Sequence, residues 1–175
     1  MERTEKPVRA GEVDTLRAFL DWHRDTFRWK CSGLTQEQLA QPLAPTDMTL
    51  GGMMKHIAVV EQSWFEDDFV GGGLMPPFDS VDWDADPDWE WHSARDDSPE
   101  ELFALLDEAR RRSDAVLDEA LAPGGVGLDG LSVAVEEERG RFSLRWIILH
   151  MIEEYARHNG HADLIRESID GQTGQ

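Results

Sequence analysis

Residues 143–169 read SLRWIILHMIEEYARHNGHADLIRESI, and the apolar side chains of this stretch follow the period of an α-helix. They recur every three or four residues and so form one continuous stripe along a helix surface. The stripe contains Leu144, Ile147, Met151, Tyr155, Ala162 and Ile165. We therefore predict a long, core-facing helix over residues 143–169, with Gly171 just beyond its end.

Two titratable side chains lie inside this apolar stripe. On a helical wheel of about 100° per residue, Glu154 and His158 point the same way as the apolar residues, whereas His150 and His161 lie at the edge of the stripe. A buried carboxylate without a partner is costly, so it requires a compensating interaction. Residues four apart project side by side, which lets Glu154 and His158 bind one divalent cation together. Alternatively, Glu154 bonds to His158 or pairs with an arginine.

A third candidate ligand, His56, occurs in the stretch GGMMKHIAVVEQSWF. This stretch belongs to another predicted helix, and His56 lies at the edge of its apolar stripe. Gly51 and Gly52, one turn earlier, lower helix propensity, and we expect them to allow close approach of a neighbouring element or a ligand. Together with the Glu/His pair, His56 would complete a three-ligand site with a position left for water or substrate. The alternative is a core histidine bonded to a backbone carbonyl.

The remaining helices are predicted from the same periodicity and from capping signals. They cover residues 13–29, 35–39, 49–70 and 98–121. Ser98 is a good N-cap, Pro99 suits the first helical position, and Glu101 completes a capping box. Four long helical segments without βαβ alternation predict an all-α fold, specifically an antiparallel four-helix bundle. We expect a single domain over residues 1–175, with its core at about residues 13–170.

Two connections between the long helices have distinctive sequences. Residues 71–97 carry prolines, aspartates and four aromatic side chains. Prolines and aspartates argue against a regular helix there, and the aromatic content argues against a disordered linker, so we expect a long ordered loop between the second and third long helices. Residues 131–139 are expected to form a short strand or an extended piece.

Composition excludes several classes of partner. The chain has 175 residues, a formal net charge of -19 and a pI of about 4.5. Nucleic acids and anionic membrane surfaces both require clustered Lys and Arg, so neither is expected as a partner. The single cysteine, Cys31, cannot form an intrachain disulfide and lacks an evident activating base. With no apolar run long enough to span a bilayer and a polar N-terminus, a cytoplasmic location is expected.

Three stretches together resemble a known family. They are LTQEQLAQPLAPTDMTLGGMMKHIAVVEQSWF (residues 34–65), SPEELFALLDEARRRSDAVL (residues 98–117) and SLRWIILHMIEEYARHNGHADLIRE (residues 143–167). They resemble the DinB/YfiT-like superfamily, and more narrowly an actinobacterial branch close to the metal-binding domain of mycothiol-dependent maleylpyruvate isomerase. The resemblance covers roughly residues 13–170. It implies an antiparallel four-helix bundle that holds a divalent metal through three side chains.

Carried onto this sequence, the ligand positions of that branch are His56, Glu154 and His158. The resemblance implies metal-dependent transfer of a low-molecular-weight thiol of the mycothiol type to a small electrophile. Zinc suits a His/Glu/His set, and nickel, iron and manganese are compatible. His161 occupies a position where many relatives carry glutamine. It is the candidate catalytic residue, either as a hydrogen-bond donor or as a general base, with a surface-edge histidine as the alternative.

Two other functions remain open alternatives. One is metal-assisted hydrolysis with His161 as the base to a bound water. The other is a non-catalytic, stress-related bundle that binds a metal or a ligand. Dimers are common among bundles of this kind, so a homodimer is the favoured oligomer.

Four further residues have more than one interpretation. His150, one turn before Glu154, could orient that carboxylate, although a structural histidine is the favoured interpretation. Arg145 and Arg157 could bind a substrate carboxylate, with solvated ion pairs favoured instead. His92 lies in the long loop and could approach the metal.

Overall fold

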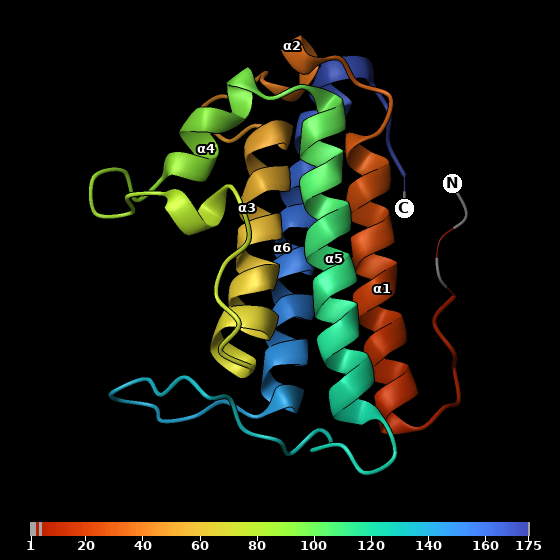
Figure 1. Ribbon diagram of the computed structural model, residues 1–175. Coiled ribbons are helices and arrows are strands. Elements are labelled where there is room, and N and C mark those ends of the chain that lie inside the picture. The colour runs from red at the N-terminus through yellow and green to blue at the C-terminus, as the bar shows by residue number, and fades with distance from the viewer. Residues whose placement is uncertain (1–2, 4, 175) are drawn as a thin grey trace.

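The computed structural model describes residue 3 and residues 5–174, and every regular element in that part of the chain is a helix (Figure 1). The all-α prediction is therefore confirmed. The long helices are α1 (Glu12–Cys31), α3 (Leu50–Gln62), α5 (Pro99–Leu121) and α6 (Leu144–Asp170). The shorter ones are α2 (Gln36–Leu39), η1 (Ser63–Phe69), η2 (Phe78–Ser80), α4 (Trp89–Ser93) and η3 (Ala94–Asp96).

The four long helices lie side by side, and they run in two directions. In Figure 1, α1 and α6 run upward and α3 and α5 run downward. The closest pairs are α1 with α6 and α3 with α5. Because α3 and α5 run the same way, the chain between them has to return along the bundle, and residues 70–98 make that return. We call residues 70–98 the crossover segment.

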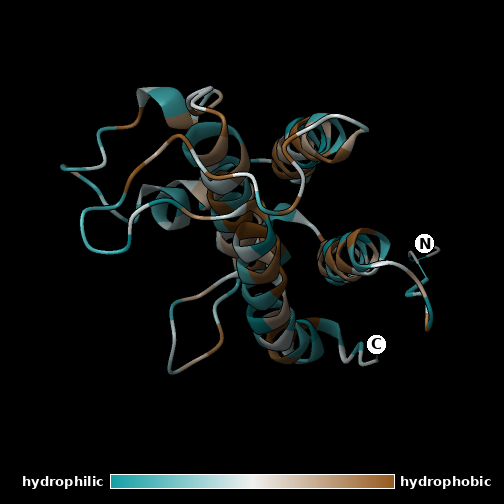
Figure 2. Cartoon of the chain, turned by 90° about the horizontal axis from the view of Figure 1, so that it is seen from below, coloured by the Kyte–Doolittle hydropathy of each residue, from teal (hydrophilic) through white to brown (hydrophobic). Residues whose placement is uncertain are grey.

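Helices α1, α5 and α6 are amphipathic, whereas nearly every residue of α3 is buried. Figure 2 shows hydrophobic and hydrophilic residues together on helices of the bundle seen from below. The hydrophobic faces meet in a core whose fully buried members include Leu20, Phe27, Met53, Ile57, Leu102, Leu117, Ile147 and Met151. No helix in the described residues is both long and apolar enough to cross a membrane.

The helix ends form where the capping signals predict them. The Ser98 hydroxyl accepts a hydrogen bond from the Glu101 amide, and the Glu101 carboxylate accepts one from the Ser98 amide at 2.7 Å. Ser143 caps α6 in the same way by accepting from the Trp146 amide at 3.2 Å. Gly171 ends α6 in the left-handed conformation, with φ of 75°, which glycine adopts without steric cost.

The crossover segment folds onto the bundle as expected, but the expectation that it contains no regular helix is wrong at α4. This helix places Trp89 and Trp91 against the core and buries Glu90. Five residues cannot form a stable helix alone, so tertiary packing stabilises α4 in spite of the surrounding prolines and aspartates.

Residues 131–139 form no strand, and they bend at 133–134 and turn at 137–139. The pairing in this region consists of single antiparallel bridges between Leu131 and Ser143 and between Glu136 and Gly140. The resulting loop closes the lower end of the bundle in Figure 1, just before α6 begins.

A cluster of polar side chains, one from each long helix, is buried inside the core. We call Arg24, Glu61, Ser113 and Tyr155 the four-helix polar cluster. Arg24 pairs with Glu61 and donates to the Ser113 hydroxyl at 2.8 Å, while the Tyr155 hydroxyl donates to Glu61 at 2.6 Å. Burial, aided by the nearby Glu61 charge, raises the pKa of Tyr155 well above its usual value, so its hydroxyl remains a donor. Glu61 is thus contacted from the other three helices.

Candidate metal centre

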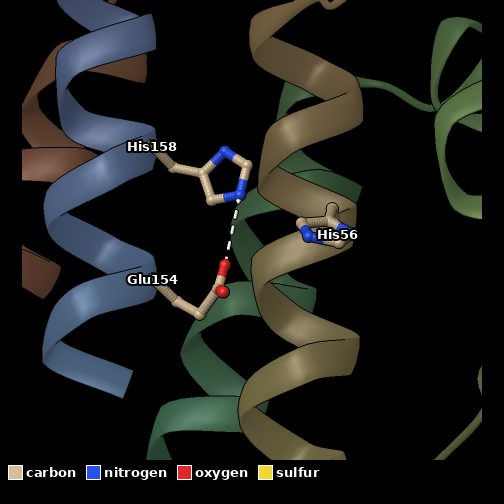
Figure 3. A group of neighbouring side chains, drawn as sticks. All are labelled: His56, Glu154 and His158. Atoms are coloured by element: carbon tan, nitrogen blue, oxygen red, sulfur yellow. Dashed lines mark ion pairs between the residues drawn. The ribbon is translucent and has the colours of Figure 1, made fainter. Parts of the chain in front are cut away.

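The three side chains predicted as metal ligands lie together between α3 and α6 (Figure 3). His56 projects from α3, and Glu154 and His158 project from successive turns of α6. One ligand atom of each lies within 4.8 Å of the other two. The Nε2 atom of His158 is 3.5 Å from an oxygen of Glu154. These three side chains, called the ligand trio below, could hold a metal ion.

Burial keeps the imidazole of His158 in the neutral form that can bind a metal. The residue is 6% exposed, and burial is the main cause that lowers the pKa of His158 to about 4, with His56, His161 and Arg157 contributing. Its imidazole is therefore neutral at neutral pH, which is the form that donates a lone pair to a metal. Its Nδ1 atom is buried and has no hydrogen-bond partner among the described residues. Because this buried nitrogen lacks a partner, the imidazole of His158 suits a site at which a ligand binds.

The two oxygens of Glu154 face different partners. One oxygen lies 3.3 Å from the Arg157 guanidinium and 4.0 Å from Nε2 of His150. The other faces His158. Glu154 is 9% exposed, as the helical wheel predicts for a carboxylate inside the apolar stripe. Arg157 therefore pairs with Glu154 and is held next to the ligand trio.

Glu90 and Trp91 contribute to the site from α4, which the sequence did not indicate. An oxygen of Glu90 lies 3.0 Å from Nδ1 of His56, and Glu90 is 6% exposed. The ring centroid of Trp91 is 4.9 Å from that of His56 and 6.4 Å from that of His158. Glu90 is 34 residues from His56 along the chain, so no helical period connects them. The only local signal of this contact in the sequence is a charged residue between two tryptophans, in the stretch WEW at residues 89–91.

The expected close approach at the glycines of α3 is confirmed. A Cβ atom on Gly52 would lie 2.6 Å from Cε3 of Trp91, and one on Gly51 would lie 3.3 Å from the carbonyl oxygen of Leu39. The neighbouring element that approaches Gly52 is α4. Gly52 therefore lets the indole of Trp91 reach the two histidines.

His161 and His150 flank the ligand trio on α6. The ring centroid of His161 is 5.4 Å from that of His158, and its Nδ1 atom is buried without a hydrogen-bond partner in the described part of the chain. His150 stacks on Trp146 with a centroid separation of 4.8 Å and an interplanar angle of 13°, and it meets the edge of Trp64 at 5.0 Å. The packing of His150 agrees with its structural interpretation.

The other candidates lie in ion pairs outside the trio. Arg145 pairs with Glu12 and Asp129, which agrees with the favoured interpretation of a surface ion pair. His92 lies 2.9 Å from Asp86, and its side chain is 59% exposed. His92 therefore does not join the ligand trio, although its neighbour Trp91 contacts two of the trio's members.

The donor set fits a divalent cation. Two imidazoles and one carboxylate are ligands that zinc and similar divalent metals accept. Two buried acidic side chains, Glu154 and Glu90, lie at or beside the trio. A cation bound between α3 and α6 would offset the cost of burying both. Three protein ligands leave room for a further ligand, as catalytic sites require.

One comparison with known proteins covers nearly the whole chain. A family model described as Mycothiol-S-transferase matches residues 15–171, a range that contains all four long helices apart from the first turn of α1. No curated protein matches the chain. The family match therefore includes the crossover segment as well as the ligand trio.

Proposed function

The chain belongs to the mycothiol-S-transferase family, and we propose that it is a divalent-metal-dependent enzyme that transfers a low-molecular-weight thiol of the mycothiol type to a small electrophile. The observation that carries this proposal is the ligand trio of His56, Glu154 and His158, in which Glu154 and His158 are buried and His56 is partly buried. Zinc is the proposed metal, because a His/Glu/His set with an open position suits it. A homodimer in the cytoplasm is the proposed state of the protein.

The proposed reaction breaks the S–H bond of the thiol and forms a bond between sulfur and an electrophilic carbon. When bound, a divalent cation favours the thiolate form of the thiol, which is the nucleophile. The thiol proton passes to a base. The electron pair displaced at carbon departs with a leaving group, or in an addition it takes up a proton at the neighbouring atom.

His161 is the proposed base. Its ring lies next to His158, and its buried Nδ1 atom has no hydrogen-bond partner among the described residues, so this nitrogen can accept a proton. Arg157, which is held at Glu154, is proposed to attract an anionic group of the substrate.

The test begins with the metal content of protein purified without a histidine tag. We expect near-stoichiometric divalent metal in the wild type and little in Glu154→Ala and His158→Ala. His92→Ala is the matched control, because it removes an exposed imidazole outside the trio. Wild-type protein that holds no metal and cannot be loaded would refute metal dependence.

The second stage uses protein loaded with Co²⁺. Addition of a mycothiol-type thiol should produce a sulfur-to-cobalt charge-transfer band in the near ultraviolet, and the loaded enzyme should conjugate the thiol to a model electrophile such as monobromobimane. A metal that binds without any thiol-dependent spectral change would favour the hydrolase or the non-catalytic alternative. His161→Gln should keep the metal and lose most of the conjugation rate.

A further inference from the structure

The hydrogen bond between Glu90 and His56 joins the crossover segment to the metal centre. It connects α4 to α3 at 3.0 Å, and both side chains are largely shielded from solvent. Glu90 Oε1 faces Nδ1 of His56, while Glu90 Oε2 is buried with no hydrogen-bond partner among the described residues. Burying a carboxylate so incompletely bonded is costly, so its position requires an explanation.

The choice of ring nitrogen determines what His56 can do. A neutral imidazole carries its proton on one nitrogen and a lone pair on the other. A carboxylate at Nδ1 holds the proton there and leaves the lone pair on Nε2. Figure 3 shows one ring nitrogen of His56 facing α6, where Glu154 and His158 lie. Since Nδ1 is bonded to Glu90, Nε2 is the nitrogen left for a metal.

We propose that Glu90 is a positioning residue for the metal centre. It fixes the tautomer and the ring orientation of His56. A residue of the crossover segment thereby determines which nitrogen of His56 is available to the metal. This inference rests on the proposed function, because it assumes that the ligand trio binds a divalent metal. The charge of the cation would also offset the buried carboxylate of Glu90, so metal binding and docking of α4 would favour each other.

Contacts on both sides of Glu90 hold α4 in the required place. The ammonium group of Lys55, next to His56 on α3, donates to the Ser93 hydroxyl at 2.8 Å and to the Asp97 carboxylate at 2.6 Å. It also lies 4.2 Å from the ring centroid of Trp89. The indole of Trp91 lies against the His56 ring. These contacts allow Glu90 little freedom to leave His56.

The test compares Glu90→Ala and Glu90→Gln with the wild type and with Asp86→Asn. Asp86 is the matched control, because it is a carboxylate of the same segment that pairs with a histidine outside the trio. Competition with a chromophoric chelator measures zinc affinity. We expect Glu90→Ala to weaken it about 10–100-fold, as is usual when a partner of a metal-bound histidine is lost. Glu90→Gln, whose amide oxygen can still accept from Nδ1, should recover much of the affinity, and Asp86→Asn should not change it.

A second readout needs no metal. Nitrogen-15 NMR of the metal-free protein should show the His56 proton on Nδ1 in the wild type and a shift toward Nε2 in Glu90→Ala. Unchanged zinc affinity in Glu90→Ala, or an unchanged tautomer, would overturn the inference and leave the proposed function standing. A wild type that binds no zinc would overturn both. Circular dichroism of each variant confirms that a loss of affinity is not a loss of fold.

Discussion

At Gly52, the absence of a side chain brings the indole of Trp91 against helix α3. A Cβ atom there would lie 2.6 Å from Cε3 of the indole, closer than non-bonded carbon atoms approach. Gly52 lies one turn before His56, so displacing Trp91 would disturb the environment of a proposed metal ligand. Gly160 on α6 is also helical, but a Cβ atom there would meet nothing within 4 Å.

Substitution by alanine should therefore change the free energy of unfolding in opposite directions at the two glycines. Gly52→Ala should lower the free energy of unfolding by about 1–2 kcal/mol, because overpacking outweighs the gain in helix propensity. Gly160→Ala should raise it by about 0.5–1 kcal/mol. Urea denaturation followed by circular dichroism measures both. Equal gains in stability from the two substitutions would show that Trp91 does not pack closely on α3.

Cys31 is expected to be unreactive in the folded protein. The residue is fully buried, and burial raises the pKa of the Cys31 thiol to about 12. At pH 8 the thiolate is then about one part in ten thousand of the total thiol, and raising the pH to 9 increases it only about tenfold. Ellman's reagent should react with Cys31 only after unfolding in guanidinium chloride. Val8→Cys supplies an exposed thiol as the positive control. Rapid native labelling of the wild type would contradict this prediction.

At the scale of the elements, the four-helix polar cluster fixes how the long helices pack. Each of its four members belongs to a different helix, and Glu61 contacts the other three. Removing one partner of a buried ion pair leaves an uncompensated charge, which is more damaging than removing both partners together. The contacts of Glu61 therefore restrict how the four helices can slide past one another.

Substitutions in this cluster should be strongly non-additive. Arg24→Met should cost about 3–5 kcal/mol of unfolding free energy, because the Glu61 carboxylate stays buried without its guanidinium. Arg24→Met combined with Glu61→Leu should recover part of that loss, because no unpaired charge remains although the buried Tyr155 hydroxyl loses its acceptor. Arg17→Met, which removes a partly exposed arginine of the same helix, should cost less than about 1 kcal/mol. Urea denaturation of the wild type, these three variants and Glu61→Leu alone completes the double-mutant cycle, and simple additivity of the two single substitutions would mean that the pair contributes little.

At the scale of the whole molecule, the core does not depend on the ligand trio. The trio lies between only two helices, whereas apolar side chains from all four long helices fill the core. A bound metal should therefore add stability to a fold that forms without it. This differs from a zinc finger, which is unfolded without metal.

Chelation should lower the melting temperature without unfolding the protein. At a zinc concentration of about 100 times Kd, binding adds about 2.7 kcal/mol, or about 5–10 °C for a chain of this size. EDTA should remove this increment while the far-ultraviolet circular dichroism at 25 °C stays helical. His158→Ala should show no zinc-dependent shift. Unfolding on chelation at 25 °C would instead identify a structural metal.

The sequence predicts the helices and the pair of Glu154 and His158 because both depend on local periodicity, whereas no local periodicity links His56, on another helix, to that pair, and the family resemblance supplies that link. Ser98, Ser143 and Gly171 mark helix ends through contacts with near neighbours, and Glu154 and His158 share a face because they are four residues apart. The contact between Glu90 and His56 depends on how the crossover segment folds, and no local pattern encodes it.

The four-helix polar cluster has a signature in the sequence that helical periodicity makes visible. Arg24 lies four residues after Leu20, and Glu61 lies four residues after Ile57, so each interrupts an apolar stripe as Glu154 does. Such interruptions identify buried polar side chains from sequence. They do not identify the partners, which come from other helices.

The parallel run of α3 and α5 has a consequence for how this protein could be redesigned. Two neighbouring helices of opposite direction can be joined by a short turn, but this pair needs a path along the length of the bundle. That path places Glu90 and Trp91 beside the ligand trio, and it also buries Met75, Phe78 and Ala94 in the core. Exchanging it for the equivalent path of another family member would therefore replace one side of the candidate site and the core contacts of that side together.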